Sequence, residues 1–431
     1  MFRTIISELL SWKKKEHRKP VIIRGARQVG KTSVVRELGK SFSQFIEINF
    51  EENPALSSFF DYGLNPDDII INLQNYLGIR ITDGETLLFF DEIQACPKAI
   101  MSLRYFFEKR PVLHVIAAGS LIDFELENVS FPVGRIDFFY MYPLSFMEFL
   151  SALSKEKLVS GITRAKEIPH AIHEELLSYV RDYIIIGGMP QVVKEYIETK
   201  NLGECQDIQT SIIETFIADF SKYTKKFHLK YVQTVFNAIP LNLGRKLKYA
   251  NISQLYQARE LSEALQLLQK AGLALTVFHS HANGIPLEYE KDHRKFKIIF
   301  FDTGLAMRIL RIPLKEILLN NDISLINEGS IAEQFVGQEL AAYSSLRERE
   351  SLFYWHREAK SSNAEVDYLI QRNGTILPIE VKSGIKKKTK SLNIFLSEKK
   401  LCKAYIISKN KYSYSEGVSS LPFYAISELF T

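Results

Sequence analysis

The sequence predicts a multidomain α/β protein, and two observations carry that prediction. Near the N-terminus, an apolar run leads into a glycine-rich loop and then into a stretch with helical spacing. Near the C-terminus, short strands carry acidic side chains in pairs. The 431 residues allow about three domains at roughly 150 residues each. The patterns described below divide the chain into four segments, 1–150, 151–226, 227–326 and 327–431.

Composition excludes several classes of protein. Hydrophobic residues make up 46% and charged residues 24%, which is the ordinary balance of a globular protein. The net charge of +5 permits an anionic partner without requiring one. Apolar stretches such as Val115–Ala118 are far too short to span a membrane, and the N-terminal lysines follow an apolar segment, the reverse of a secretory signal. Cys96, Cys205 and Cys402 lie far apart, which argues against a disulfide framework or a zinc ribbon. We therefore expect a cytoplasmic protein without a membrane partner.

The glycine-rich loop has the pattern of a phosphate-binding loop. The apolar run Val21–Ile23 leads into Gly-x-x-x-x-Gly-Lys-Thr at residues 25–32, and the next residues have helical spacing. Backbone N–H groups of such a loop and the start of the helix face the phosphates. Lys31 is expected at the β- and γ-phosphates and the Thr32 hydroxyl at Mg²⁺. The predicted ligands are therefore ATP or ADP with Mg²⁺, and the predicted nucleotide-binding residues are Gly25, Ala26, Arg27, Gln28, Val29, Gly30, Lys31, Thr32 and Ser33.

A second strand supplies acidic residues for the same site. Leu87–Phe90 is a continuous apolar run, typical of a parallel strand covered on both faces, and Asp91 and Glu92 follow it directly. Asp91 is expected to hold Mg²⁺ through its water shell. Glu92 is expected to polarise the attacking water as the general base. The sequence therefore predicts ATP hydrolysis as well as ATP binding.

Two further residues are candidates for the ATPase site. Ser120 follows the apolar run Leu113–Ala118, and the strand after the acidic one can lie beside the phosphates. Ser120 is thus either a reporter of the γ-phosphate or a small turn residue, with equal support. Arg135, in a Gly-Arg turn, is expected to neutralise transition-state charge, in cis or from a neighbouring subunit of a homo-oligomer. Its alternative is a surface arginine.

These motifs carry a family resemblance. RGARQVGKT, FFDEIQ, AGSLIDFEL, GRIDFFYMYPLSFMEF and GGMPQVV together resemble the AAA+ ATPases of the archaeal-ATPase/STAND side. More closely, they resemble prokaryotic proteins that pair an AAA domain with a C-terminal domain of unknown function called DUF4143. The resemblance implies a sensor position for Ser120 and a Gly-x-Pro element at Gly188–Pro190. It implies a P-loop AAA+ parallel sheet in the first segment.

The middle of the chain is predicted to be mostly helical. Segment 151–226 has helical spacing, with a break at Gly187-Gly188 that suggests a hinge, and we interpret it as a helical lid. In segment 227–326, three helical stretches precede two apolar runs around Asn283-Gly284, which is the order of a winged helix. The nearby basic residues leave two readings equally supported, DNA binding and protein packing. These basic residues are Arg245, Lys246, Lys248 and Arg259.

The last segment contains a second candidate site. Glu333 lies on an amphipathic helix, and Asp367 lies on a strand with Glu365 on the same face. After the Asn373-Gly374 turn, Glu380 and Lys382 share a face of the next strand.

This arrangement resembles the PD-(D/E)xK nuclease fold, with Val366 in place of the nominal proline. The resemblance implies that Asp367 and Glu380 chelate Mg²⁺, that Lys382 activates or orients water, and that Glu333 completes the acidic cluster. Lys386, Lys387, Lys388 and Lys390 are either phosphate contacts or a solvated loop.

The leading hypothesis is an AAA+ ATPase that couples nucleotide state to a nuclease-like C-terminal module acting on nucleic acid, DNA being the candidate partner. The alternative is an ATP-dependent regulatory scaffold whose nuclease fold is inactive and binds a protein partner.

Overall fold

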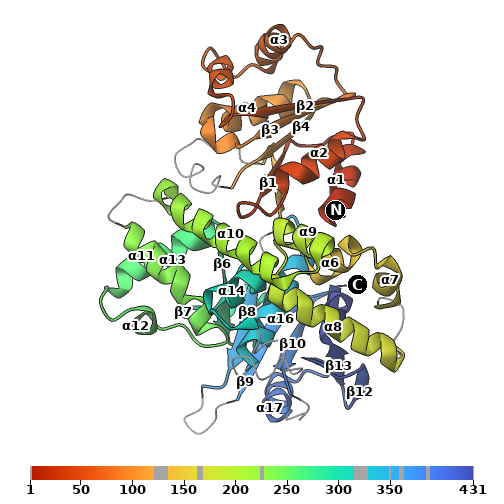
Figure 1. The fold of residues 1–431 in the computed structure, drawn as a ribbon, viewed down its shortest axis with the longest axis vertical. Coiled ribbons are helices and arrows are strands. Elements are labelled where there is room, and N and C mark those ends of the chain that lie inside the picture. Colours follow the sequence, from red (N-terminus) through yellow and green to blue (C-terminus); the bar gives the residue numbers. More distant parts are fainter. Residues whose placement is uncertain are drawn as a thin grey trace. The chain divides into compact units, whose positions relative to one another are not determined.

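A computed structural model of the chain describes residues 2–120, 134–162, 168–223, 228–314, 329–348, 351–358, 364–384 and 389–430. The chain divides into two units, Met1–Tyr142 with Ser345–Arg349, and Pro143–Ser344 with Glu350–Thr431. The first runs from red to orange in Figure 1, and most of the second runs from yellow through green to blue.

The first unit is built on a parallel sheet. Its strand order is β2-β3-β4-β1-β5, and every neighbouring pair is parallel. Strands β3 and β4 are buried along their whole length, as expected for a sheet covered on both faces. The five strands are β1 (Val21–Arg24), β2 (Gln44–Asn49), β3 (Thr86–Asp91), β4 (His114–Ala118) and β5 (Asp137–Tyr140).

Helices connect these parallel strands. Helix α2 begins directly after the glycine-rich loop, and α4 connects β3 to β4. Aromatic and aliphatic side chains of the sheet and helices form the core, with Phe90 packed edge-on against Phe60 and Phe106. The helical segments are α1 (Ile5–Lys13), α2 (Lys31–Gly39), η1 (Pro54–Phe60), α3 (Pro66–Leu77), η2 (Ile93–Ala95) and α4 (Pro97–Lys109).

A short segment from the C-terminal part of the chain also belongs to the first unit. The backbone N–H of Tyr140 donates to Leu346 O at 2.7 Å. The Arg347 guanidinium lies 3.6 Å from Glu8 and 3.7 Å from Asp137, and it covers the ring of Phe139. The first unit is therefore discontinuous in sequence, which local patterns do not reveal.

The second unit begins with helices. Helix α8 ends at Ile186 and α9 begins at Pro190, so the predicted break at Gly187-Gly188 is confirmed. The lid role of this region stays a prediction. The helical segments are α6 (Phe146–Ala152), α7 (Glu156–Ile162), α8 (His170–Ile186), α9 (Pro190–Thr199), α10 (Leu202–Tyr223), α11 (Leu229–Ala238), η3 (Pro240–Asn242), α12 (Tyr249–Ile252), α13 (Ala258–Lys270), η4 (Leu287–Glu290), α14 (Thr303–Ile309), α16 (Ser330–Tyr343), α17 (Lys390–Lys399) and η7 (Phe423–Phe430).

An eight-stranded mixed sheet follows, in the order β12-β13-β11-β10-β9-β8-β6-β7. Strand β9 runs antiparallel to both of its neighbours, β8 and β10, and β11 is parallel to β10. The strands are β6 (Ala274–Ser280), β7 (Lys291–Phe300), β8 (Leu352–His356), β9 (Glu365–Arg372), β10 (Thr375–Lys382), β11 (Ala404–Ser408), β12 (Ser413–Ser415) and β13 (Val418–Pro422).

This sheet changes the expected domain organisation. The predicted hairpin is confirmed as the antiparallel pair β6–β7, but β6 also pairs in parallel with β8. An unpaired strand edge leaves a row of N–H and C=O groups open, and β8 satisfies that edge of β6. The expected separation of segment 227–326 from segment 327–431 therefore differs from the structure, which has both in one sheet. The predicted boundaries at 226/227 and 326/327 lie outside the described residues.

Helix α16 is held closely against the sheet. A Cβ atom at Gly337 would lie 2.2 Å from Ile299 Cδ1 and 2.5 Å from Tyr368 Oη, so a larger residue would require these side chains to move. The Gln334 side chain accepts from Phe300 N at 2.8 Å and donates to Phe300 O at 2.6 Å, which sets the helix against the end of β7. These contacts bring Glu333 to the sheet. None of the helices in the described parts of the chain has the length and apolar character needed to cross a membrane.

Candidate functional sites

The phosphate-binding loop connects β1 to α2 in a conformation that requires glycine. Gly25 has φ +149°, and a Cβ atom there would lie 2.1 Å from the backbone oxygen of Met141, the residue directly after β5. Gly30 has φ +96° and precedes the first turn of α2. An L side chain at either position would strain the backbone. The loop is therefore shaped by its glycines and by the residue that follows β5.

The Lys31 side chain lies back along the loop. Its ammonium donates to Gly25 O at 3.0 Å and to Ala26 O at 2.8 Å. Burial lowers the pKa of Lys31 to about 8, while the charges of Glu92 and Asp91 act in the opposite direction. These two acidic residues thus lie close enough to favour the charged form of the lysine.

Arg3 is a loop contact that sequence reasoning missed. Its guanidinium donates to Val29 O at 2.9 Å and to Tyr142 O at 2.6 Å, and the residue is buried. The Arg3 side chain thereby connects the N-terminal residues both to the loop and to Tyr142, which lies shortly after β5. A single arginine near an N-terminus belongs to no motif, so no sequence signal could have identified it.

Asp91 meets Thr32 as expected for a shared metal site. The Thr32 hydroxyl donates to Asp91 Oδ2 at 2.9 Å, and Asp91 ends strand β3. Burial raises the pKa of Asp91 to about 6, although the hydrogen bond from Thr32 favours the carboxylate. The two predicted Mg²⁺ residues are therefore in direct contact.

Glu92 lies at the same edge of the sheet, in a left-handed conformation with φ +47°. Gln94 Nε2 donates to Glu92 Oε2 at 2.6 Å, so a second missed residue orients the predicted base. Ser120, just after β4, accepts from Arg27 Nε of the loop at 3.2 Å. Ser120 is therefore beside the loop, and its role as γ-phosphate sensor stays a prediction.

The acidic residues of the C-terminal segment also come together. Asp367 Oδ2 accepts from Val381 N at 2.8 Å, which ties β9 to β10 beside Glu380. The Lys382 ammonium contacts Glu380 Oε1, while Glu380 Oε2 is buried with no hydrogen-bond partner among the described residues. Glu333 approaches from α16, and its carboxylate lies close enough to Asp367 for their charges to interact. We call Glu333, Glu365, Asp367 and Glu380 the carboxylate cluster.

A buried lysine that sequence reasoning missed lies within this cluster. Lys297 Nζ is 2.6 Å from Glu365 Oε1, 3.4 Å from Glu333 Oε2 and 3.8 Å from Asp367 Oδ1, and its side chain is 5% exposed. Burial alone would lower the pKa of Lys297, but the charges of these carboxylates raise it above its ordinary value. The available signal was a lysine inside the apolar run Phe296–Phe301.

The carboxylates of the cluster differ in the direction of their pKa shifts. Burial, and then the charge of Asp367, raises the pKa of Glu333 to about 8 and that of Glu380 to about 7. Burial also raises the pKa of Asp367. For Glu365 burial acts upward, but the Lys297 and Lys246 ammonium groups bring the pKa below its ordinary value. Glu365 is therefore the member of the cluster that is firmly ionised at neutral pH.

The chain supplies its own positive charge here. Three ammonium groups contact the four carboxylates of the cluster. Lys297 and Lys382 make the contacts described above, and Lys246 Nζ lies 3.4 Å from Glu365 Oε2. Lys297 therefore reduces the mutual repulsion of these carboxylates without a metal ion.

Three protein families match the chain. Residues 17–150 match an AAA domain, residues 177–316 match a domain of unknown function (DUF8612), and residues 328–426 match a domain of unknown function (DUF4143). The chain contains an AAA domain and a DUF4143 domain. The AAA match includes the loop, Asp91, Glu92 and the parallel sheet, so the first unit is a P-loop ATPase of the AAA type.

Several solved structures resemble the chain at low identity. The Walker-type ATPase of Pyrococcus abyssi is 16% identical, with 72% of this chain and 96% of that chain covered and a TM-score of 0.46. The Orc1 protein of Aeropyrum pernix, solved in complex with DNA, is 12% identical over 73% of this chain and 92% of that one, with a TM-score of 0.27. A STAND protein with a tetratricopeptide repeat sensor from Pyrococcus horikoshii is 14% identical over 77% and 47%, with a TM-score of 0.26. No curated protein matches the sequence.

The AAA domain does not place Arg135 at its own nucleotide loop. Strand β5 pairs in parallel with β1, and Asp137 is the partner of Val21, at the opposite end of β1 from the loop. Because strand residues rise about 3.3 Å each, Arg135 lies on the order of 13 Å or more from the loop along the strand direction. It pairs instead with Glu108 at 3.1 Å. The expected role in cis is wrong, and a role at a neighbouring subunit stays a prediction.

The DUF4143 match contains Glu333, Asp367, Glu380 and Lys382, whereas Lys297 lies inside the DUF8612 match. The carboxylate cluster therefore lies within the DUF4143 match, and the buried lysine that contacts it comes from the DUF8612 match. Of the predicted lysine run, residues 386–388 lie outside the described part of the chain, and Lys390 begins α17.

Proposed function

We propose that this protein is an ATP-hydrolysing AAA switch whose nucleotide state controls a nuclease-like C-terminal module that acts on nucleic acid. The single observation that carries the proposal is the convergence of Asp367, Glu380 and Lys382 on neighbouring strands, with Glu333 opposite them. In the same chain, an AAA domain carries a complete phosphate-binding loop.

The residues of the ATPase site fit Mg²⁺ and ATP. Thr32 and Asp91 form a hydroxyl–carboxylate pair of hard oxygen ligands, 2.9 Å apart at the start of α2. Mg²⁺, when bound, would neutralise charge on the phosphates. Lys31 would exchange its contacts with loop carbonyls for the β- and γ-phosphate oxygens, and Glu92, held by Gln94, would accept a proton from the attacking water.

Two features support a nuclease-like module. The element order α16, β8, β9, β10, α17, β11, with β9 antiparallel to β8 and β10 and with β11 parallel to β10, is similar to the PD-(D/E)xK core. The orphaned oxygen of Glu380 lies beside Asp367, and such a pair fits Mg²⁺. These two residues would hold the ion, and Lys382 would orient water.

A regulatory scaffold is the second candidate, and Lys297 is the observation that favours it. An ammonium that already neutralises Glu333, Glu365 and Asp367 reduces the electrostatic gain from a divalent ion. Under this alternative the module binds a protein partner and does not cleave nucleic acid.

The basic residues of segment 227–326 give limited support to DNA binding through a winged helix. Lys246 contacts Glu365, and Arg259 contacts Glu263 at 3.0 Å within α13. A lysine held by a carboxylate is less available to a phosphate. We therefore propose that contacts with nucleic acid are made by the C-terminal module in preference to segment 227–326.

ATP turnover and cleavage by the full-length protein distinguish the two candidates. We expect DNA to raise the ATPase rate and Mg²⁺ or Mn²⁺ to support cleavage that Asp367→Ala abolishes. Lys31→Ala, which should prevent nucleotide binding, is the control for the ATPase arm. If DNA and RNA leave turnover unchanged and no substrate is cut with either metal, the scaffold is the correct function.

A further inference from the structure

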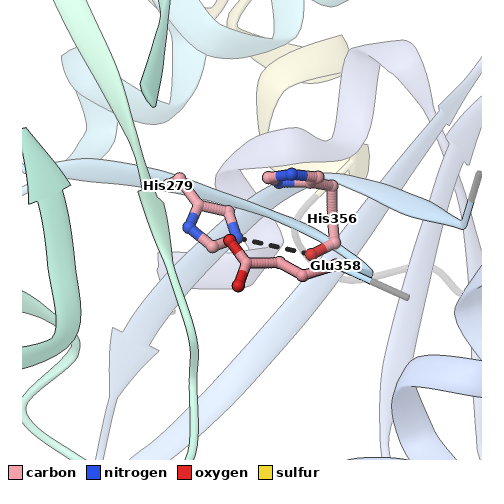
Figure 2. Close-up of side chains that lie close together, drawn as sticks. All are labelled: His279, His356 and Glu358. Carbon is pink, nitrogen blue, oxygen red and sulfur yellow. Dashed lines mark hydrogen bonds between the residues drawn. The ribbon is translucent and has the colours of Figure 1, made fainter. Parts of the chain in front are cut away.

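We propose that His279, His356 and Glu358 form a binding site for a transition-metal ion of the Zn²⁺ type, which we call the histidine site (Figure 2). This site shares no residue with the carboxylate cluster, although His356 lies opposite Glu365 in the β8–β9 pair, and it does not depend on the proposed function. One ligand atom from each of the three residues lies within 4.8 Å of the other two.

The fold positions the two histidines on neighbouring strands. Strands β6 and β8 are parallel, with His279 opposite Tyr354, and His356 lies two residues further along β8. Side chains two residues apart share a face of a strand, so His356 projects on the side of Tyr354. The two imidazole rings are 4.3 Å apart between centroids, and Glu358 is the second residue after the end of the strand.

A hydrogen bond defines which nitrogen of His279 is available. His279 Nε2 lies 3.4 Å from the backbone oxygen of His356, and Figure 2 shows this contact as a dashed line. A carbonyl oxygen can only accept, so Nε2 carries the proton and Nδ1 of the neutral ring carries a lone pair. A hydrogen bond from the second ring nitrogen to a backbone carbonyl is the usual way to orient a metal-binding histidine.

The free nitrogens are buried. His279 is 0% exposed, and within the described residues its Nδ1 and the Nδ1 of His356 have no hydrogen-bond partner. A buried acceptor without a partner is unfavourable, and a metal ion bound to it would remove that cost.

The spacing requires only a small closure. A tetrahedral Zn²⁺ with bonds of about 2.0–2.1 Å separates its ligand atoms by roughly 3.3 Å. The observed limit of 4.8 Å therefore needs a movement on the order of 1.5 Å. Glu358 can supply it, because its side chain is 44% exposed and follows the end of a strand, whereas the histidines are held by the sheet.

The ligand types favour a nitrogen-binding metal over Mg²⁺. Lys295 contacts Glu358 and lies 3.5 Å from Asp292, so a metal at Glu358 has to displace an ammonium. Imidazole ligands suit Zn²⁺, Ni²⁺ and Cu²⁺, while Mg²⁺ prefers sites made of oxygen alone. The histidine site should therefore select Zn²⁺, and the carboxylate cluster should not.

Binding is tested on the full-length protein after removal of metal with a chelator. We measure the stoichiometry and affinity for Zn²⁺ by calorimetry and the d–d absorption spectrum with Co²⁺. These measurements are made in a Cys402→Ser background, because Cys402 is an exposed thiol that could bind zinc by itself. We expect one equivalent of Zn²⁺, a Co²⁺ spectrum typical of low coordination number, and no displacement by a hundredfold excess of Mg²⁺.

Two variants and a matched control assign the site. Glu358→Gln alters an exposed side chain and should fold normally, and it should weaken Zn²⁺ binding at least tenfold, as should His356→Asn. His281→Ala removes an exposed histidine whose ring lies 5.0 Å from that of His279, and it should change the affinity by less than twofold. The proposal is overturned if the protein binds no stoichiometric Zn²⁺, or if Glu358→Gln binds it as tightly as the parent.

Discussion

Replacing the buried Lys297 with methionine is the sharpest test of the carboxylate cluster. Methionine has a similar length and no charge, so the change removes the ammonium without leaving a large cavity. Lys297 Nζ lies 2.6 Å from Glu365 Oε1, and its side chain is 5% exposed. At an effective dielectric constant of about 20, this distance corresponds to roughly 6 kcal/mol of gross attraction.

The net effect is smaller than the gross attraction. Burying the ammonium is itself unfavourable, and removing one partner of a buried ion pair typically destabilises a protein by about 3–5 kcal/mol. We expect Lys297→Met to lower the free energy of unfolding of the second unit by this amount at pH 8. At lower pH Glu333 and Glu380 take up protons while Glu365 stays ionised, so the loss should be smaller at pH 5.5 by the part that Glu333 and Glu380 contribute.

Tryptophan fluorescence can follow the second unit alone. The chain has two tryptophans, Trp12 in α1 of the first unit and Trp355 in β8 of the second. In a Trp12→Phe background, urea unfolding monitored at Trp355 reports on the unit that contains the cluster. The full-length protein is used for every measurement.

Lys246→Met provides a matched control on the same carboxylate. Lys246 Nζ lies 3.4 Å from Glu365 Oε2, but its side chain is 41% exposed, and exposed ion pairs contribute about 0–1 kcal/mol. A loss of less than about 1 kcal/mol for Lys297→Met, equal to that of the control, would refute the reasoning. So would a loss that does not change between pH 5.5 and pH 8.

Four other predictions concern the two sites. Gly25→Ala places a Cβ atom 2.1 Å from Met141 O, so nucleotide affinity measured by calorimetry should fall at least tenfold, and unchanged affinity would contradict the loop geometry. Glu92→Gln should still bind ATP, but its turnover should fall by about 10²-fold or more. Arg135→Ala should lower the turnover rate only at the higher protein concentrations. Equal turnover rates of this variant and the parent protein at all concentrations would assign Arg135 to the surface. The pKa of Glu333 is about 8 in the folded state, against an ordinary value of 4.5. Between these two pH values the folded state holds a proton that the unfolded state has released. The free energy of unfolding should therefore fall as the pH rises from 4.5 to about 8. This fall amounts to at most about 1.4 kcal/mol per pH unit, and Glu333→Gln should reduce it. If the urea midpoint of this variant depends on pH as it does in the parent protein, another group is responsible for the titration.

The sequence by itself determined the features that are local or follow a fixed pattern. The strand, loop and helix around residues 21–39 agree with the prediction, because apolar runs and glycines act over a few neighbouring residues. Asp91 reached Thr32 because parallel strands place their carboxyl ends at one edge of the sheet. In the C-terminal segment, side-chain alternation was sufficient to predict strands β9 and β10 and the shared face of Glu380 and Lys382.

Only the tertiary structure decided which distant residues complete these sites. Arg3 meets Val29, and Lys297 meets Glu365, through contacts between residues far apart in the chain. The register of β5 against β1 moved Arg135 to the far edge, because a parallel strand can begin level with either end of its neighbour. The pairing of β6 with β8 likewise joined a predicted wing to the C-terminal sheet and brought His279 to His356. Strand order and register depend on long-range burial and backbone hydrogen bonding, which local sequence patterns do not encode.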